Sequence, residues 1–506
     1  MLTKSPLRKS GIFLPISALP GDFAVGDFSE RSNNFIEFLR ASTQTYWQIL
    51  PLNPLGRGNC PYDSSSSFAI DPIYSDVELL IDWKLITASD VEFEKIKNDR
   101  SEGRHVSACN YDLGRQQKNT LLLKAFQNLK NFDSPHKAAS VQDLTALQAA
   151  LADFVSAQAS WLEGFAEYEL CSQVFSTQDW LEWPKALKMR DPVALAQLKF
   201  EYPEQIKFTN FCQFVAELSL RKLRKKAAEC KVELIGDLPI YVSLHSADVW
   251  LNQQFFQLDE NGSPTKVSGV PPDQMCPEGQ KWNHPLYNWS KLKNSSYSYW
   301  INKIERVKQL YDVVRLDHFI GFSRYYEIPA QDENACHGQW QEGPGADFFA
   351  ALASRWPRLP FIVEDLGCTG EDVDKLRDKY KLPGMAVYLF ASEEKDCPHA
   401  LASVRENSVY YSSTHDTNTL VGSMDEAEPA AAVVKSFWNI VEKMSHSAAN
   451  TCIFPLQDLL GLGTDSRINI PGTATGNWNF RFTNEQISSE ALSEKLKQLG
   501  DSTRRC

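Results

Sequence analysis

Three features are missing from this sequence of 506 residues. Its 11 cysteines form no Cys-x-x-Cys pair and no framework spacing, which argues against a disulfide scaffold or structural zinc site and fits reduced thiols. Basic residues are not in excess: 52 Lys and Arg stand against 64 Asp and Glu, a net charge of −12, so the surface repels nucleic acid and anionic membranes. No apolar run approaches the ~18 residues of a membrane helix.

What the chain does contain is material for a large core. Its 28 Phe, 13 Trp and 17 Tyr supply enough apolar area to exclude disorder as the main state. Lys4, Arg8 and Lys9 precede an apolar stretch at 11–20, which is roughly the pattern of a signal peptide. Two prolines interrupt that stretch and no small-x-small cleavage site follows promptly. We therefore expect a globular, cytoplasmic protein.

Short apolar runs alternate with helical stretches, a pattern typical of parallel strands covered by helices, so we predict an α/β fold. An apolar stripe predicts a helix over about 208–229, whose basic patch at 221–226 is most simply a solvated helix face. Residues from about 90 to 200 predict an all-helical insertion, with 141–157 as its clearest helix. A proline-rich loop is expected at 264–290, because the Pro271-Pro272 pair breaks regular structure. The runs that predict strands are 46–50, 232–236, 312–316, 360–363 and 408–411.

Four of the apolar runs end in a carboxylate: Asp237, Asp317, Glu364 and Asp416. In a barrel of parallel strands the carboxyl ends meet at one face, and chemistry is done there. A single acid at a strand end is weak evidence, because Asp is a common turn residue. Here four carboxylates end four of the apolar runs, and three of them are flanked by Arg or His. This pattern favours an active site.

The surroundings of two of these acids suggest different roles. Arg315 lies two residues before Asp317, so both side chains project to the same face of a strand, and the guanidinium favours an ionised carboxylate. A salt bridge at the barrel rim is the plain alternative. Glu364 follows an apolar run, and desolvation would raise its pKa toward that of a general acid. One ionised and one protonated carboxyl is the arrangement that glycoside chemistry uses.

A metal site is an open alternative. Acids at barrel strand ends also hold divalent ions, and such sites need a Lys or His base nearby, for which His318 and His415 are available. Aromatic content favours carbohydrate, because sugar rings stack on flat rings; a hydrophobic loop core would explain the same residues. The aromatic residues that cluster on or beside the long loop are Phe255, Phe256, Trp282, Tyr287 and Trp289.

Ordered motifs from near residue 8 to near residue 483 resemble the amylomaltases, the 4-α-glucanotransferases also called disproportionating enzymes. They include Tyr46-Trp-Gln-Ile-Leu-Pro-Leu, Cys60-Pro-Tyr62, Ile235-Gly-Asp-Leu-Pro-Ile-Tyr-Val242, Gly269-Val-Pro-Pro-Asp273, Gly279-Gln-Lys-Trp282, Arg315-Leu-Asp-His-Phe319, Glu364-Asp-Leu-Gly367, Thr414-His-Asp416 and Asn477-Trp478. The resemblance implies one catalytic (β/α)8 TIM barrel over 1–506 with helical and loop insertions, an active-site lid loop at about 250–290, and no separate carboxyl-terminal β-domain.

The resemblance also implies roles and a reaction. Asp317 is similar to the family's nucleophile, Glu364 to its acid/base and Asp416 to its third carboxylate, and α-1,4-glucan chains would be transferred with retention through a covalent glucosyl-enzyme. No metal or organic cofactor, nucleic acid or membrane is implied. The positions that match sugar-binding residues are Asp237, Arg315, His318 and His415 at the donor site, and Tyr62, Asp273, Gln280 and Trp282 along the glucan path or its lid.

Several positions depart from the family pattern, and they leave acceptor preference open. They are Gln274-Met275 at the lid tip, Asn283-His284, Ile320, Glu342 and Thr417. Two rival functions also stay open, an α-glucan hydrolase on the same barrel and a non-catalytic glucan-binding protein. Donor length, cyclic products and oligomeric state do not follow from the sequence.

Overall fold

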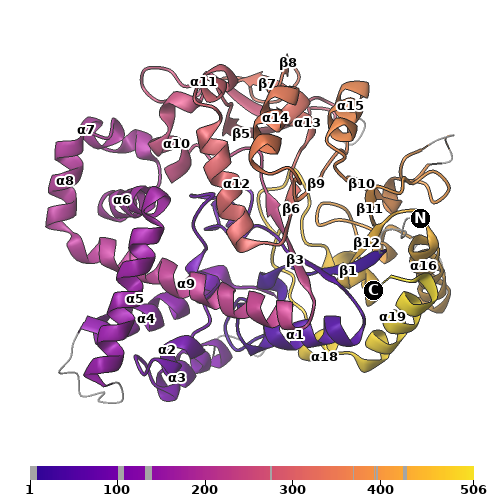
Figure 1. The fold of residues 1–506 in the computed structure, drawn as a ribbon, viewed down its shortest axis with the longest axis horizontal. Coiled ribbons are helices and arrows are strands. Elements are labelled where there is room, and N and C mark those ends of the chain that lie inside the picture. The colour runs from indigo at the N-terminus through magenta and orange to yellow at the C-terminus, as the bar shows by residue number, and fades with distance from the viewer. Residues whose placement is uncertain are drawn as a thin grey trace.

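Eight parallel strands close into a barrel at the centre of the molecule (Figure 1). The computed structural model describes residues 8–100, 108–130, 140–273, 276–367, 370–392, 394, 397–424 and 430–505. Around the barrel the strand order is β1-β12-β11-β10-β9-β6-β3-β2. The strands are β1 (Lys9–Phe13), β2 (Tyr46–Gln48), β3 (Glu233–Leu238), β6 (Val313–Leu316), β9 (Phe361–Val363), β10 (Gly384–Val387), β11 (Ser408–Tyr411) and β12 (Thr451–Pro455). The expected (β/α)8 barrel is confirmed.

The five strands expected from apolar runs are β2, β3, β6, β9 and β11. Strands β1, β10 and β12 were not anticipated. The apolar stretch at 11–20 belongs to β1 and the turn after it, and its residues are buried against the barrel. Neither β1 nor β10 reads as a strand by composition, because β1 begins Lys-Ser-Gly and β10 begins with Gly384.

Helices surround the barrel, and the described chain after β12 consists of helices and an irregular segment and carries no further named strand. The predicted helix at 208–229 exists but begins earlier, at Pro203, whose fixed φ suits a first helical turn. The main surrounding helices are α1 (Glu30–Ala41), α9 (Pro203–Glu229), α12 (Ser298–Leu310), α14 (Gly345–Arg355), α15 (Glu371–Lys379), α16 (Ala430–His446), α17 (Leu456–Leu459), α18 (Asn484–Ile487) and α19 (Glu490–Thr503).

A group of helices lies between β2 and β3 in the chain and forms the lobe at the left of Figure 1. The helix expected at 141–157 is α5, and a capping box formed by Ser140 and Asp143 fixes its first turn. The members are α2 (Glu78–Asp82), α3 (Ala88–Arg100), α4 (Tyr111–Lys130), α5 (Val141–Ala157), α6 (Ala159–Phe175), α7 (Lys185–Lys188) and α8 (Pro192–Glu201). Helix α9 packs along this group and joins it to β3.

The segment predicted as a proline-rich loop at 264–290 is not a loop. It carries β4 (Lys266–Val270) and β5 (Gln280–Pro285), which pair with each other in an antiparallel sheet of order β5-β4-β7-β8, with β7 (Arg324–Pro329) and β8 (Gln339–Glu342). The Pro271-Pro272 pair falls in the connection between β4 and β5, where no ladder hydrogen bond is lost. Short connecting elements α10 (Ala247–Leu251), η5 (Gln253–Phe255), α11 (Trp289–Asn294) and α13 (Ile320–Ser323) flank this sheet.

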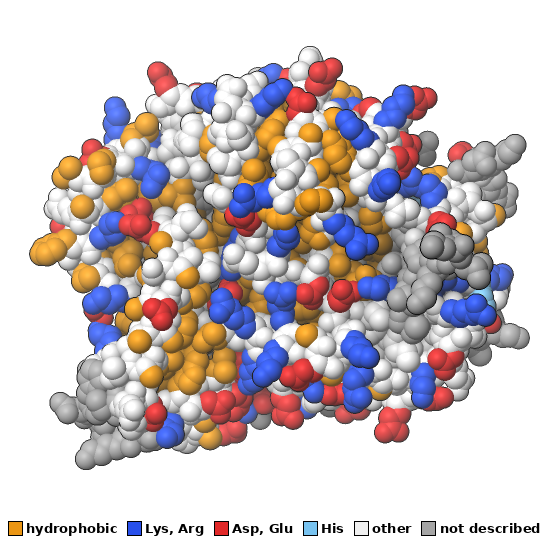
Figure 2. Space-filling model, in the orientation of Figure 1, with side chains coloured by type: hydrophobic (Ala, Val, Ile, Leu, Met, Phe, Trp, Pro, Cys, Tyr) orange, Lys and Arg blue, Asp and Glu red, His pale blue; other side chains and the backbone are white. Residues whose placement is uncertain are grey.

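Charged side chains of both signs are interspersed over the face shown in Figure 2. The basic patch of α9 is a solvated helix face, as expected, and three of its cations are paired: Lys222 with Asp76, Arg224 with Asp312 and Lys226 with Glu37. No helix in the described part of the chain is long and apolar enough to cross a membrane.

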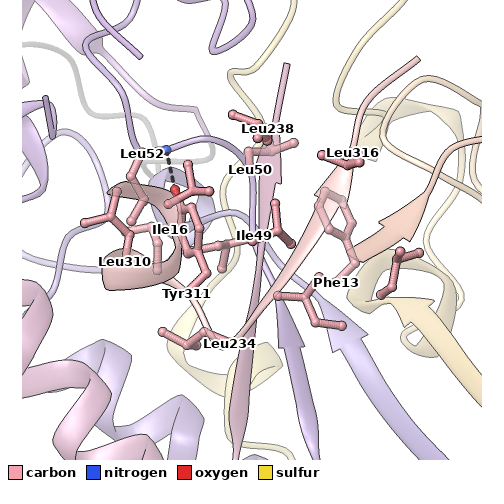
Figure 3. Packing of buried hydrophobic residues seen from close by; sticks show 14 of the residues in the cluster. Phe13, Ile16, Ile49, Leu50, Leu52, Leu234, Leu238, Leu310, Tyr311 and Leu316 are labelled. Carbon is pink, nitrogen blue, oxygen red and sulfur yellow. Dashed lines mark hydrogen bonds between the residues drawn. The ribbon is translucent and has the colours of Figure 1, made fainter. Parts of the chain in front are cut away.

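A close contact behind β3 explains one glycine of the Ile-Gly-Asp-Leu-Pro motif. A Cβ at Gly236 would lie 2.2 Å from the ring of Tyr311. The Tyr311 hydroxyl in turn accepts a hydrogen bond from the Leu52 backbone N–H at 3.2 Å, among the leucines and isoleucines of the core (Figure 3). The Tyr311 ring therefore packs between α12 and the strand that carries Asp237. Only glycine at position 236 leaves room for this ring.

The two ends of the barrel sheet meet at β1 and β12, which pair in parallel from Lys9 and Thr451 onward. Arg505 lies beneath this junction with only 1% of its surface exposed. Its guanidinium donates hydrogen bonds to the backbone carbonyls of Lys9, Asn450, Ser445 and Ala449. A buried arginine just after α19 thus ties together the backbone at the junction of the first and last barrel strands.

Candidate active site

The four acids found at strand ends gather at one end of the barrel. Asp237 lies near the end of β3, while Asp317, Glu364 and Asp416 follow β6, β9 and β11. Asp317, Glu364 and Asp416 line a cavity of about 1,760 Å³. Asp237 lies just behind the cavity wall and is 2% exposed. The predicted site residues that line the cavity itself are Tyr62, Asp273, Gln280, Trp282, Arg315, Asp317, His318, Glu364, His415 and Asp416.

Arg315 joins three of these carboxyl groups. Its Nη1 lies 2.5 Å from Asp237 Oδ2 and 3.1 Å from Asp317 Oδ1, and its Nη2 lies 3.0 Å from Glu364 Oε2. The guanidinium is 3% exposed, so these contacts form away from bulk water. A planar, permanently charged fork can hold several carboxylates in fixed positions. Arg315 and Asp317 project to the same side, as their spacing predicted.

The backbone at His318 positions Glu364. His318 has φ +48°, in the left-handed region that non-glycine residues rarely adopt, which marks local strain. In this conformation its backbone N–H donates to Glu364 Oε2 at 2.6 Å. Burial lowers the pKa of the His318 imidazole to about 4, so the ring is neutral near pH 7. Its Nε2 atom is buried and has no hydrogen-bond partner within the described chain, so it is available to a sugar hydroxyl.

Tyr62, His415 and Asp416 form a second hydrogen-bonded group, which is joined to the first through Asp237. The Tyr62 hydroxyl donates to Asp237 Oδ2 at 2.7 Å and lies 3.0 Å from His415 Nε2, and the two rings stack. His415 Nε2 lies 3.2 Å from Asp416 Oδ2. Burial raises the pKa of Asp416, but the charge and hydrogen bond of His415 and a hydrogen bond from Asn469 outweigh it. The net pKa lies well below the usual range, so Asp416 is an anion.

The protonation of Asp317 differs from expectation. Burial and then the neighbouring charge of Glu364 raise the pKa of Asp317 well above its usual range, although Arg315 acts in the opposite direction. A hydrogen bond between the two carboxyl groups contributes to the same shift. Arg315 thus favours the ionised form of Asp317, as expected, but burial and the charge of Glu364 act against it and have the larger effect on the pKa. Burial and a neighbouring negative charge both make ionisation of the Asp317 carboxyl less favourable than in water.

The geometry does not favour the metal-site alternative. The position between Asp237, Asp317 and Glu364, where a cation would lie, is taken by the guanidinium of Arg315. Over the ranges that the structure describes, no group of three or more His, Cys, Asp or Glu side chains has an arrangement that could hold a metal ion.

Three other predicted residues come from the antiparallel sheet. Trp282 and Gln280 lie on β5, and the Trp282 indole donates to Gln280 Oε1 at 3.1 Å. The Trp282 ring meets His318 edge-on, with centroids 4.8 Å apart. Asp273 follows β4 and accepts from the Cys276 backbone N–H at 2.6 Å. Gln274 and Met275, the expected lid tip, lie outside the described residues.

Most of the aromatic cluster expected to bind sugar is core instead. Phe256 and Tyr287 are 3% and 1% exposed, and Trp289 packs against Tyr287. Phe255 borders a different cavity. Of the five rings, Trp282 alone is among the residues that line the catalytic cavity. Asn283, one of the departures from the family pattern, has φ +63°, a conformation that asparagine tolerates better than most residues.

Some residues at the site were missed from the sequence. Asn469 donates to Asp416 Oδ1 at 2.6 Å, and Arg467 donates to the Asp416 carbonyl at 2.8 Å. Both come from the segment after β12, which is irregular and far away in the chain. No spacing or periodicity signal marks them. Only a pairing of that segment with the Asp416 loop could have revealed them.

A parallel barrel with a neighbouring pair of carboxyl groups at its carboxyl end defines an enzyme of the class that breaks and remakes glycosidic bonds. A family model, glycoside hydrolase family 77, described as 4-alpha-glucanotransferase, matches residues 14–487. The 4-alpha-glucanotransferases of Aquifex aeolicus (strain VF5) and Streptococcus pneumoniae serotype 4 (strain ATCC BAA-334 / TIGR4) are 34% and 35% identical to the chain. Those alignments cover 97% of the chain in each case, and 98% and 96% of the relatives.

Solved structures of amylomaltases are also similar to this chain. The amylomaltase from Streptococcus agalactiae, in complex with acarbose, has a TM-score of 0.89 and 29% identity, covering 98% of this chain and 99% of that one. The amylomaltase from Corynebacterium glutamicum, at 18% identity and a TM-score of 0.75, shares the fold over 98% of this chain and 75% of that one. The chain belongs to the 4-alpha-glucanotransferase family, glycoside hydrolase family 77.

Proposed function

We propose that Asp317 and Glu364 carry out the chemistry of this 4-alpha-glucanotransferase, which moves α-1,4-glucan segments from a donor to an acceptor glucan or glucose. The observation that carries the proposal is the position of Arg315, which holds both carboxyl groups at the mouth of one cavity. The acarbose complex of the Streptococcus agalactiae amylomaltase supports an oligosaccharide ligand for this cavity.

In the first step Asp317 attacks the anomeric carbon of the donor sugar, and Glu364 protonates the departing glycosidic oxygen. This step requires a proton on Glu364, which the leaving oxygen accepts, and an ionised Asp317, whose charge Arg315 stabilises. The bond from the anomeric carbon to the leaving oxygen breaks as the bond to Asp317 forms. The products are a covalent glucosyl-enzyme and the shortened chain with a new 4-hydroxyl.

In the second step Glu364, now a carboxylate, removes the proton from the 4-hydroxyl of an acceptor. The acceptor oxygen displaces Asp317 from the anomeric carbon, and two inversions give net retention of the α-configuration. Asp416, kept anionic by His415 and Asn469, would bind hydroxyls of the donor ring. His318, His415, Tyr62 and Asp237 would surround the same ring, and the unpartnered His318 Nε2 would take one hydroxyl.

Transfer prevails over hydrolysis only if the acceptor position binds sugar well and disfavours water. We assign that selection to the β4–β5 hairpin, which carries Asp273, Gln280 and Trp282 at the cavity wall. The Trp282 ring, held against His318, offers a flat apolar face beside the reacting carboxyl groups.

The test is to incubate the protein with maltotriose and resolve the products by chain length over time. Disproportionation gives glucose together with oligomers longer than the substrate, at a constant number of reducing ends. Rising reducing ends with only shorter products would mean a hydrolase. Binding with no bond exchange would mean a non-catalytic glucan-binding protein.

The roles of the two acids are tested by Asp317→Asn and Glu364→Gln. Each should lower transfer at least about a hundredfold while circular dichroism shows an intact fold. A near-normal rate for either variant would remove that assignment without removing the activity from the protein.

A further inference from the structure

A carboxyl group outside the catalytic cavity contacts the loop that carries Asp416. Asp458 lies on α17, directly after β12, and β12 pairs with β11, the strand that leads into this loop (Figure 1). None of the surface of Asp458 is exposed, and it is not among the residues that line the catalytic cavity. Asp458 takes no part in either chemical step, so the presence of a buried carboxyl group at this position needs another explanation.

Asp458 holds both ends of the Asp416 loop. Its Oδ2 accepts hydrogen bonds from the hydroxyls of Ser412 at 2.5 Å and Ser413 at 2.6 Å, just after β11. Its Oδ1 accepts a hydrogen bond from the Leu420 backbone N–H at 2.7 Å, beyond Asp416. The start and the end of the loop are therefore attached to a single side chain.

The part of the loop between these contacts forms one wall of the catalytic cavity. Residues 413–418 all line the cavity, and they include His415 and Asp416. The chain after α17 adds a further contact, because the Asn469 backbone N–H donates to the His415 carbonyl at 3.1 Å. The position of Asp416 therefore depends on α17 and the chain that follows it, as well as on β11.

The hydrogen bonds to Asp458 offset the cost of burying its carboxyl group. Burial raises the pKa of Asp458, and the hydrogen bonds from Ser412, Ser413 and Leu420 act in the opposite direction. If the carboxyl group were removed, two buried hydroxyls and one buried N–H would lose their acceptor. We expect the loop to move until these groups find new partners, and Asp416 would move with it.

We propose that Asp458 is a positioning residue for the transfer reaction, which holds Asp416 and His415 where they bind the donor sugar. The inference rests on the proposed function, because it requires Asp416 to act on the donor ring. A buried carboxylate that only stabilised the barrel would change the free energy of unfolding and leave the site of the folded enzyme unaltered. The two roles therefore predict different rates for the folded enzyme.

The test is a double-mutant cycle between Asp458 and Asp416, measured as the rate of maltotriose disproportionation at saturating substrate. Asp416→Asn alone should lower this rate about a hundredfold, and Asp458→Ala alone about tenfold. The double variant should be no more than about twofold slower than Asp416→Asn, because the carboxylate that Asp458 positions is already absent. A further tenfold loss in the double variant would overturn the proposal.

Asp248→Ala is the matched control for the loss of a buried carboxylate. Asp248 is 2% exposed and accepts hydrogen bonds from the backbone N–H and hydroxyl of Ser67 and from the Tyr299 hydroxyl. None of these three residues lines the catalytic cavity. Asp248→Ala should lower the urea midpoint about as much as Asp458→Ala does, with a rate within about twofold of normal. Equal rate losses in the two variants would show that Asp458 acts through stability alone.

Asp458→Asn tests whether the hydrogen bonds are responsible. Its amide oxygen can accept from the Leu420 N–H, and its NH₂ group can donate to the two serine oxygens, whose hydroxyls rotate. The rate should therefore recover to within about threefold of normal, and no recovery would contradict the role of these hydrogen bonds. If Asp458→Ala does not fold, Ser412→Ala replaces it in the cycle. Its expected loss of about threefold should disappear in the Asp416→Asn background, and a threefold loss in both backgrounds would overturn the proposal.

The rate of Asp416→Asn distinguishes this proposal from the proposed function. A near-normal rate would count against the role of Asp416 at the donor ring and therefore against both. A slow Asp416→Asn variant with independent effects of Asp458→Ala would overturn only the positioning role of Asp458.

Discussion

The two sides of the catalytic cavity are built differently. On the barrel side, Asp237, Asp317 and Glu364 are tied to one buried arginine, and each polar contact is made within the protein. On the antiparallel-sheet side, Gln280, Trp282 and Asp273 are partly exposed and contact mainly their own segment. The charged groups of the barrel side are held in position before any ligand binds. The side chains of the sheet side have exposed surface that a bound ligand would cover.

This difference suggests a division of labour. Bond breaking needs preorganised charges in a site with little water, which the barrel side supplies. The choice between a sugar and water as acceptor needs contact area that only a sugar can fill, which the sheet side supplies. Substitutions on the barrel side should therefore abolish both transfer and hydrolysis. Substitutions on the sheet side should shift the reaction from transfer toward hydrolysis.

The largest effect is expected from Arg315→Met. It would leave Asp237 and its neighbours as buried carboxyl groups without their cation, so transfer should fall by about a thousandfold or more. Unfolding free energy should fall by about 3–5 kcal/mol. Steady-state rates and urea unfolding check both. Arg315→Lys, which keeps the charge without the fork, should recover stability more than rate; equal recovery of both would contradict the bridging role.

Trp282→Ala tests the sheet side. We expect the transfer-to-hydrolysis ratio on maltotriose to fall about tenfold, because water gains access that the indole face denies it, while donor cleavage changes less than about threefold. The measurement is the rate of new reducing ends against the rate of longer oligomers. If transfer and hydrolysis fell in parallel, the two sides of the cavity would not have separate roles.

Asn469→Ala tests how far a single hydrogen bond on the barrel side contributes to activity. Removing the hydrogen bond to Asp416 Oδ1 should lower kcat about tenfold, because Asp416 loses one of the groups that hold it as an oriented anion. Asn469→Asp should cost more, since it places a second negative charge against the first. Equal and negligible effects of both substitutions would remove Asn469 from the site.

The smallest effect concerns pH and His318. In the folded protein this imidazole is neutral down to a pKa of about 4, whereas in the unfolded chain it gains a proton near pH 6.5. Between those values the unfolded state binds more protons, so stability falls as pH drops from 6.5 to 4 and this contribution levels off below. His318→Asn, which tolerates the positive φ, should give a shallower fall in urea midpoint over that window. An unchanged slope would contradict the burial of a neutral ring.

The sequence predicted the barrel side well because its signals are local. Asp317 and Glu364 each follow a short apolar run, and the two-residue spacing of Arg315 and Asp317 sets their common direction. The sheet side was predicted poorly. The strands β4 and β5 are short and polar and flank a proline pair, so their pairing depends on partners that local pattern does not reveal.

The aromatic residues show the same limit. Trp282 and Tyr287 lie five positions apart on one segment, yet Tyr287 is buried in the core and Trp282 borders the cavity. Composition gives both the same propensity to stack on sugar. Trp282 lies on β5, whereas Tyr287 follows that strand and pairs with Phe256, and both placements depend on the assembled sheet and the packing around it.

The seam at β1 and β12 has a consequence for how the protein is made. The first strand of the barrel in chain order, which ends at Phe13, pairs on one side with a strand that begins only at Thr451. At about 5–20 residues per second, the intervening chain takes on the order of 20–90 seconds to synthesise. For that time one edge of β1 has no barrel partner, an exposed edge of the kind that pairs with other chains. The nascent protein therefore cannot complete its catalytic barrel until β12 and Arg505 emerge, and it is while translation continues that it most needs protection from aggregation.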